Sequence, residues 1–243
     1  MTGARLDLER VGKSFRGLRA VHDVSFAVPP GAIHALIGPN GAGKTTIFNM
    51  IAGVLAPDSG AVKLDGRVIS GLRADLACDA GVGRTFQLVR PFMGLSVLEN
   101  VTIGALHRRP GVAEARDSAA AILERLGLHA RRHQLAHSLT LPDRKRLEVA
   151  RALATEPKLL LLDEVMAGLR PTEVDVMVGF LSELNRQTGL TILLIEHVMR
   201  AVMALAAHVV VVSYGEKIAE GTPQEIARHQ AVLDVYLGDP EAA

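Results

Sequence analysis

A phosphate-binding loop is the feature of this sequence with the clearest chemistry. Residues 38–45 match the pattern G-x-x-x-x-G-K-[ST] and directly follow an apolar run at residues 32–37. Glycines let the backbone curl with its N–H groups pointing inward, which forms a cradle for phosphate oxygens. Lys44 can span the β- and γ-phosphates of a nucleotide, and Thr45 can ligate Mg²⁺. The predicted nucleotide contacts of this phosphate loop are Gly38, Pro39, Asn40, Gly41, Ala42, Gly43, Lys44, Thr45 and Thr46.

Two adjacent carboxylates, Asp163 and Glu164, follow a short and wholly apolar run at residues 159–162. Such a run is typical of a strand buried on both faces of a parallel sheet, and ligands bind at the carboxyl ends of such strands. Asp163 can hold Mg²⁺ through its water shell, and Glu164 can orient or deprotonate an attacking water. A capped turn would not explain two acids at this place.

Three further residues are weaker candidates for the same site. His197 follows a second apolar run at residues 191–195, although a lone histidine is more often an ordinary surface or core residue. Gln87 follows an apolar residue, and a solvated strand end explains it as well. Phe15 is a lone aromatic residue in a loop predicted at residues 13–17, where an ordinary core phenylalanine is an equal alternative.

The strands and helices expected around these candidate site residues indicate an α/β fold of the P-loop NTPase type with a mostly parallel core sheet. The strands at residues 159–162 and 191–195 should adjoin each other, because both are short, apolar and followed by polar groups. The strand at residues 32–37 feeds the phosphate loop, and a helix is expected over residues 44–53.

Antiparallel strands are predicted toward both ends of the chain. Residues 6–11 and 21–28 alternate apolar and polar side chains, and Asp65-Gly66 is typical of a two-residue hairpin turn, which together indicate an antiparallel β subdomain. A second hairpin is expected over residues 209–218. A C-terminal extension of about residues 214–243 would include two short helices.

A helical insertion, or helical subdomain, is predicted over about residues 95–155. Ser96 and Glu99 fit a capping box, and the last helix of the insertion opens at Thr140. This helix carries a basic run at residues 144–146, which we interpret as a solvated face rather than a nucleic-acid contact.

The composition gives no indication of a nucleic-acid-binding, disulfide-bonded or membrane-spanning protein. The chain has 243 residues, a net charge of +1 and only 3% aromatic residues, which gives no reason to expect nucleic-acid binding. The only cysteine, Cys78, excludes an intrachain disulfide and fits a reducing compartment. The apolar runs are too short or too interrupted to span a bilayer. We expect one cytoplasmic domain over residues 1–243.

The order of these motifs resembles that of the ATP-binding cassette subunits of membrane transporters, and the resemblance covers nearly the whole chain. It implies ATP and Mg²⁺ as ligands and hydrolysis of ATP as the reaction. Phe15 would stack on adenine, and Gln87 would reach Mg²⁺ and report to a membrane partner. Glu164 would be the general base, His197 would contact the γ-phosphate, and Lys44 would belong to the same catalytic set.

Particular segments resemble one branch, the branched-chain amino-acid importer ATPases. These segments are residues 84–87, 195–199 and the ending at residues 221–238. This branch implies a cassette on the inner face of the cell membrane, bound to transmembrane permease subunits and served indirectly by an extracytoplasmic solute-binding protein. Open alternatives are an ATPase of the lipid-exporter type and a regulatory cassette subunit with little turnover.

Cassettes of this family work in pairs, so that a signature turn of one subunit completes the ATP site of the other. The family's Leu-Ser-Gly-Gly-Gln appears here as Leu139, Thr140, Leu141, Pro142 and Asp143. Pro142 lacks the N–H that would face the partner's γ-phosphate, and Asp143 puts a carboxylate nearby. The lost hydrogen bond should weaken a closed dimer by about 1.5–3 kcal/mol.

Two other departures from the family pattern lie near the carboxylates. Val165 and Met166 follow Glu164 where proline is usual, and Arg170 stands where the dimer-contact loop usually has Asp or Asn. Together with Pro142, Arg170 motivates the hypothesis that the second ATPase subunit is a different cassette. A homodimer is the alternative.

Overall fold

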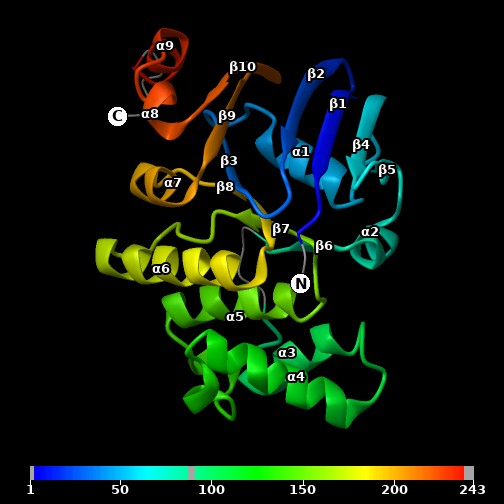
Figure 1. The fold of residues 1–243 in the computed structure, drawn as a ribbon, viewed down its shortest axis with the longest axis vertical. Coiled ribbons are helices and arrows are strands. Elements are labelled where there is room, and N and C mark those ends of the chain that lie inside the picture. The colour runs from blue at the N-terminus through cyan, green and yellow to red at the C-terminus, as the bar shows by residue number, and fades with distance from the viewer. Residues whose placement is uncertain (1–2, 87–90, 238–243) are drawn as a thin grey trace.

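Two sheets and a set of helices make up the computed structural model, which describes residues 3–86 and 91–237 (Figure 1). The antiparallel sheet and the core sheet lie in the upper part of Figure 1, and the helices between residues 97 and 153 extend below them. The mixed α/β architecture with a parallel core confirms the predicted fold class.

The antiparallel sheet has the strand order β2-β1-β4-β5. Its strands are β1 (Leu6–Phe15), β2 (Leu18–Val28), β4 (Ser59–Leu64) and β5 (Arg67–Val68). Asp65 and Gly66 form the predicted two-residue turn, with φ of 48° and 77°. The prediction of a loop over residues 13–17 is wrong, because β1 continues to Phe15 and only Arg16 and Gly17 turn the chain. Both turn residues have positive φ, which matches the twist of paired strands and lets pairing reach the tip.

The core sheet has the strand order β10-β9-β3-β8-β7-β6 and is parallel except for the hairpin between β9 and β10. Its strands are β3 (Ile33–Ile37), β6 (Val82–Arg84), β7 (Leu159–Asp163), β8 (Thr191–Ile195), β9 (His208–Ser213) and β10 (Glu216–Gly221). Every residue of β3, β7 and β8 is buried. Because these strands are parallel, the residues that follow them meet at one edge of the sheet.

The continuous apolar runs arise because both faces of the sheet are covered. Leu160 and Leu162 belong to one hydrophobic cluster, whereas Leu159 and Leu161 belong to the other. The helices outside the helical insertion are α1 (Lys44–Ile51), α2 (Ala74–Ala80), α6 (Pro171–Thr188), α7 (Met199–Leu205), α8 (Pro223–Ile226) and α9 (Gln230–Leu237). Full burial of one leucine is worth about 1.5–3 kcal/mol, so this strand contributes strongly to stability.

Helices occupy the predicted insertion. They are α3 (Val97–Ala105), α4 (Val112–Arg125), the short 3₁₀ turns η1 (His129–Arg131) and η2 (Ala136–Ser138), and α5 (Leu141–Leu153). The capping box of Ser96 and Glu99 at the start of α3 is confirmed. Helix α5 lies between α6 and the lower helices α3 and α4 in Figure 1, so it joins the insertion to the core. In the part of the chain that the structure describes, no helix has the length and apolar character needed to cross a bilayer.

Candidate nucleotide site

The phosphate loop connects β3 to α1, and its glycines are required by close approaches of the backbone. A Cβ at Gly38 would lie 2.0 Å from the carbonyl oxygen of Val212, and one at Gly43 would lie 2.4 Å from that of Ala20. Gly41 has open space around it but a φ of 79°, a conformation that side chains disfavour. The sequence therefore holds the backbone in a curl that any other residue at 38 or 43 would disturb.

Lys44 lies inside this curl. Its side chain is buried, and Nζ donates hydrogen bonds to the carbonyl oxygens of Gly38 (2.6 Å) and Pro39 (2.8 Å). Burial lowers the pKa of Lys44, while the carboxylates of Glu164 and Asp163 act to raise it. The ammonium is thus held at the mouth of the loop, next to carboxylates that belong to another strand.

The loop fits a polyphosphate. Helix α1 begins at Lys44, and no side chain among the described residues caps it, so its first N–H groups are available to an anion. Thr45 is exposed and so accessible to a bound cation, while Ala42 is a buried residue of the loop. The N–H groups, a fixed ammonium and an exposed hydroxyl are the donors and the metal ligand that Mg-ATP requires.

Asp163 is the last residue of β7 and is 2% exposed. Its N–H donates to Oγ1 of Thr85 (3.0 Å), and its Oδ2 accepts from Nη2 of Arg84 (3.0 Å). Burial raises the pKa of Asp163, and Arg84 acts in the opposite direction. The other guanidinium arm of Arg84 donates to Oδ1 of Asn49 on α1 (2.5 Å). Arg84 therefore ties the carboxylate to the helix after the phosphate loop.

Glu164 and His197 meet at the carboxyl edge of the sheet. Nε2 of His197 lies 2.7 Å from Oε1 of Glu164, and the Glu164 N–H donates to the carbonyl of Ile195 (2.9 Å). Glu164 has a φ of 50°, in the left-handed region that a non-glycine residue rarely adopts. The ends of β7 and β8 are thereby joined, and His197 holds the carboxylate in a defined direction.

Lys145 corrects the interpretation of the basic run at residues 144–146 as a solvated face. Its side chain is buried, and Nζ donates to the carbonyl oxygen of Glu164 (2.9 Å). Lys145 shares a face of α5 with Val149 and Ala152, which are buried at spacings of four and seven residues. This helical spacing was the signal in the sequence that the charge of the run concealed.

The signature turn opens α5, with Thr140 as the N-cap residue and Pro142 in the first turn. Asp143 is buried, and its carboxylate accepts from Oγ1 of Thr140 (2.8 Å) and forms ion pairs with Arg131 and Arg146. The charge of Asp143 is therefore compensated within its own chain. Leu139 is buried, while Leu141 is 41% exposed beside it.

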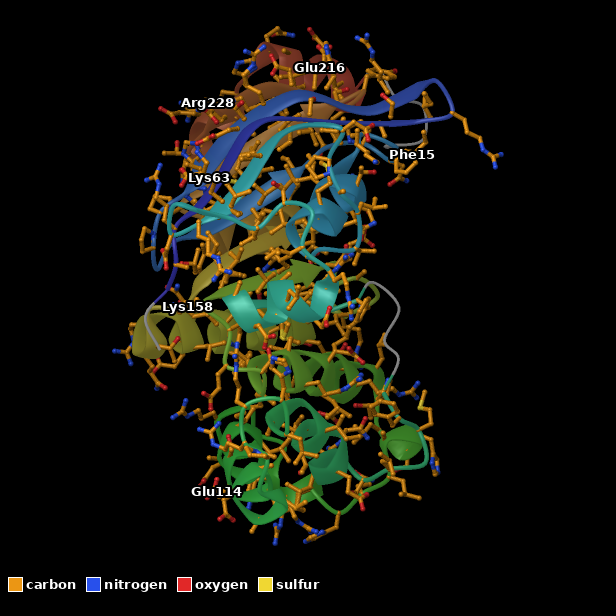
Figure 2. The ribbon with its side chains drawn as sticks, turned by 90° about the vertical axis from the view of Figure 1, so that its right-hand side faces the viewer. Phe15, Lys63, Glu114, Lys158, Glu216 and Arg228 are labelled. Carbon is orange, nitrogen blue, oxygen red and sulfur yellow. The ribbon has the colours of Figure 1, made fainter. Side chains whose placement is uncertain are left out.

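The two remaining predicted residues lie toward the periphery or beyond the described chain. Phe15 ends β1 and is 41% exposed, with Nζ of Lys13 5.9 Å from its ring centre (Figure 2). The same hairpin approaches the phosphate loop at Ala20, and stacking of an adenine on Phe15 stays a prediction. Gln87 lies outside the described residues.

Comparison with known proteins identifies the family of the chain. The ABC transporter family model matches residues 21–167, and the model described as branched-chain amino acid ATP-binding cassette transporter matches residues 216–242. The chain is 40% identical over 241 residues to the high-affinity branched-chain amino acid transport ATP-binding protein LivG of Salmonella typhimurium, covering 93% of this chain and 94% of that protein. It is 38% identical to the lipopolysaccharide export system ATP-binding protein LptB of Escherichia coli, over 97% of this chain and 98% of that protein.

A solved structure shows the same arrangement of elements. The ADP conformation of MJ1267, an ATP-binding cassette of an ABC transporter, superposes with a TM-score of 0.89 at 30% identity, covering 97% of this chain and 99% of that one. The family match spans the phosphate loop and both carboxylates, which the fold brings to one edge of the core sheet. The chain belongs to the ATP-binding cassette family of transporter ATPases.

Proposed function

We propose that this ATPase drives the import of branched-chain or related amino acids through a separate membrane permease. The observation that carries the hydrolytic role is the contact of 2.7 Å between Glu164 and His197, which follow β7 and β8. Strand β8 lies next to β3, which leads into the phosphate loop. The choice of amino acids as the solute is supported by the similarity to LivG and by the match of the C-terminal residues 216–242.

The roles of the individual residues follow from their positions. The phosphate loop and Lys44 would bind the phosphates, and Phe15 would stack on the adenine. Thr45, Asp163 and Gln87 would hold Mg²⁺, which supplies charge neutralisation at the phosphate oxygens when bound. Glu164 would accept the proton of the attacking water, and His197 would keep its carboxylate directed at that water.

The hydrolytic unit would be a pair of cassettes. Pro142 removes one donor from the signature turn, and Arg170 is exposed at the start of α6, where it pairs with Glu173 at 2.5 Å. An arginine with one neighbouring carboxylate still offers donors to a partner surface. We therefore favour a mixed pair, in which a second cassette supplies an acidic or polar surface opposite Arg170.

A groove between the core and the helical insertion would receive the permease at the inner face of the membrane. It has a volume of about 300 Å³ and includes the exposed apolar side chains of Phe86, Phe92 and Ile103. A helix seated in this groove would contact Phe86, which directly precedes Gln87 in the sequence. A solute-binding protein would act on the far side of the permease and would not touch this chain.

Uptake of labelled leucine into membrane vesicles tests this proposal. Vesicles would contain the permease and cassettes encoded beside this chain, with ATP supplied on the cassette side and the solute-binding protein on the other. We expect ATP-dependent uptake that Glu164→Gln abolishes and that exposed Glu114→Gln preserves. The similarity to LptB makes lipid export the second candidate. ATP hydrolysis stimulated by lipopolysaccharide but not by the loaded binding protein would favour lipid export and contradict amino-acid import.

A further inference from the structure

A buried lysine on the helix after the signature turn contacts the main chain of the proposed catalytic glutamate. Lys145 is 5% exposed, and its Nζ lies 2.9 Å from the carbonyl oxygen of Glu164. Burying an ammonium costs free energy unless charges and acceptors compensate it. Here the carbonyl oxygen of Glu164 accepts from the ammonium, a contact that an apolar residue at this position of α5 could not make.

We propose that Lys145 is a positioning residue that fixes the turn after β7, so that the Glu164 carboxylate faces the attacking water. This inference rests on the proposed role of Glu164 as the general base. It adds a physical link between α5, which carries the signature turn, and the reacting end of the sheet.

The Glu164 backbone needs such support because its φ of 50° is unfavourable for a glutamate. Its N–H is held by the carbonyl of Ile195 on β8, at 2.9 Å, and its carbonyl is held by Lys145 on α5. Both peptide groups that flank the side chain are thus fixed by different elements. Loss of either contact would let the turn relax toward a common conformation and swing the carboxylate away from His197.

Glu196 also contacts the turn after β7, at Met166. It is 1% exposed, and its Oε1 accepts the N–H of Met166 at 2.8 Å, while Oε2 has no hydrogen-bond partner among the described residues. Burial raises the pKa of Glu196 to about 7, and Lys145 acts to lower it. The two groups therefore stabilise each other's charge while each holds one peptide group of the segment from Glu164 to Met166.

The contact between Lys145 and Glu164 connects the helical insertion to the core sheet. Lys145 is two residues beyond Asp143 of the signature turn, on the same helix, and it reaches into the core. A displacement of α5 would move the carbonyl of Glu164 directly. The position of the helical insertion can thus set the geometry of the catalytic carboxylate without any contact to nucleotide.

The test compares Lys145→Met, which removes the donor and charge, with Lys145→Arg, which retains both. The exposed lysine before β7, Lys158 (Figure 2), gives the matched control Lys158→Met. We expect Lys145→Met to lower kcat by about 10- to 100-fold, because misplacement of a catalytic group by about 1 Å has an effect of this size. KM and the Kd for Mg-ATP should stay within about twofold, Lys145→Arg should recover most of kcat, and the control should match the natural chain.

Several results would overturn the inference. An unchanged kcat in Lys145→Met would contradict the positioning role. An equal loss of kcat and of ATP affinity in both Lys145→Met and Lys145→Arg would also contradict it, because such a loss indicates a purely structural lysine. If Lys145→Met does not fold, Glu196→Gln decides, with an expected loss of kcat of at least about threefold at unchanged Kd. Glu164→Gln is measured in parallel: full activity there would refute the base assignment itself, whereas its inactivity beside an active Lys145→Met would refute only the positioning role.

Discussion

Nε2 of His197 lies 2.7 Å from Oε1 of Glu164, although the residues are separated by a long helix in the chain. They meet because β7 and β8 pair in parallel with Asp163 opposite Ile195, so that the next residues of both strands leave the sheet together. A carboxylate fixed by an imidazole beside a phosphate-binding loop is suited to direct a water at a phosphoryl group.

Removal of the imidazole should therefore slow hydrolysis without loosening the nucleotide. We expect His197→Ala to reduce kcat by about 100-fold, because the Glu164 carboxylate loses the group that orients it. The Kd for ATP should remain within about twofold of the natural value. Steady-state ATPase assays and equilibrium binding measure the two quantities, and the exposed His133→Ala serves as control. A kcat for His197→Ala equal to that of the control would contradict the assignment.

The phosphate loop makes a prediction about stability in the absence of nucleotide. Gly43→Ala would place a Cβ 2.4 Å from the carbonyl oxygen of Ala20 at a φ of 99°. Unfolding in urea should show a loss of about 2–4 kcal/mol in the free energy of unfolding. Gly41→Ala has the strained φ but no close neighbour, so it should lose only about 1 kcal/mol. Equal losses in the two variants would mean that the approach to Ala20 is not a constraint.

A buried histidine pair predicts how stability depends on pH. His34 is 6% exposed, and its ring centre lies 5.1 Å from that of His208. Burial, with His208 as the next cause, lowers the pKa of His34 from 6.5 to about 4, while Glu220 acts to raise it. The folded state therefore keeps His34 neutral where the unfolded chain already binds a proton.

Acid should destabilise the folded state, because His34 binds its proton at a higher pH in the unfolded chain than in the folded one. The free energy of unfolding should be highest above pH 6.5 and should fall as the pH decreases toward 4, by about 1–3 kcal/mol from this residue. His34→Leu should remove this part of the slope. Urea unfolding at pH values between these limits measures it, with exposed His133→Leu as control. A slope that His34→Leu leaves unchanged would place the titrating group elsewhere.

A substitution in the signature turn is expected to strengthen the dimer of cassettes. Pro142→Gly restores an N–H in the first turn of α5, where it can donate to a nucleotide held by a partner. In a Glu164→Gln background with Mg-ATP, we expect the dimer to become about 10- to 100-fold tighter, equivalent to the lost hydrogen bond of about 1.5–3 kcal/mol. Sedimentation velocity gives the dissociation constant. An unchanged constant would show that this peptide group does not face the partner's ATP.

Most of the fold could be predicted because its signals are local. The wholly apolar run at residues 159–162 indicates a strand covered on both faces, and the Asp65-Gly66 pair indicates a two-residue turn. The first part of β1 was predicted as a strand, but its last residues, 13–15, were predicted as part of a loop, because Lys13 and Ser14 are polar and the turn Arg16-Gly17 is short. Pairing across a tight hairpin compensates for this polarity, and pairing is not visible in one strand alone.

Site residues could be predicted where a reactive side chain stands close after a strand pattern in the sequence. Asp163 and Glu164 come directly after an apolar strand pattern, and Lys44 lies at the end of the glycine-rich loop that follows another, so their place at the edge of the sheet was foreseeable. Lys145 could not be placed in this way, since its charge suggests solvent while the packing of α5 against the core decides its burial. Arg84 was likewise missed as a partner of Asp163, because their contact depends on the pairing of β6 with β7.

The role of Glu164 as the general base is tested by Glu164→Gln, with the exposed Glu114→Gln as control (Figure 2). Binding and hydrolysis of Mg-ATP would be measured on the same preparation of the full chain, together with its second cassette if the lone chain is inactive. We predict a Kd within about twofold of the natural value and a fall in kcat of at least about 100-fold, because the proton acceptor is lost. Hydrolysis at the rate of the control would contradict the assignment of Glu164 as the general base.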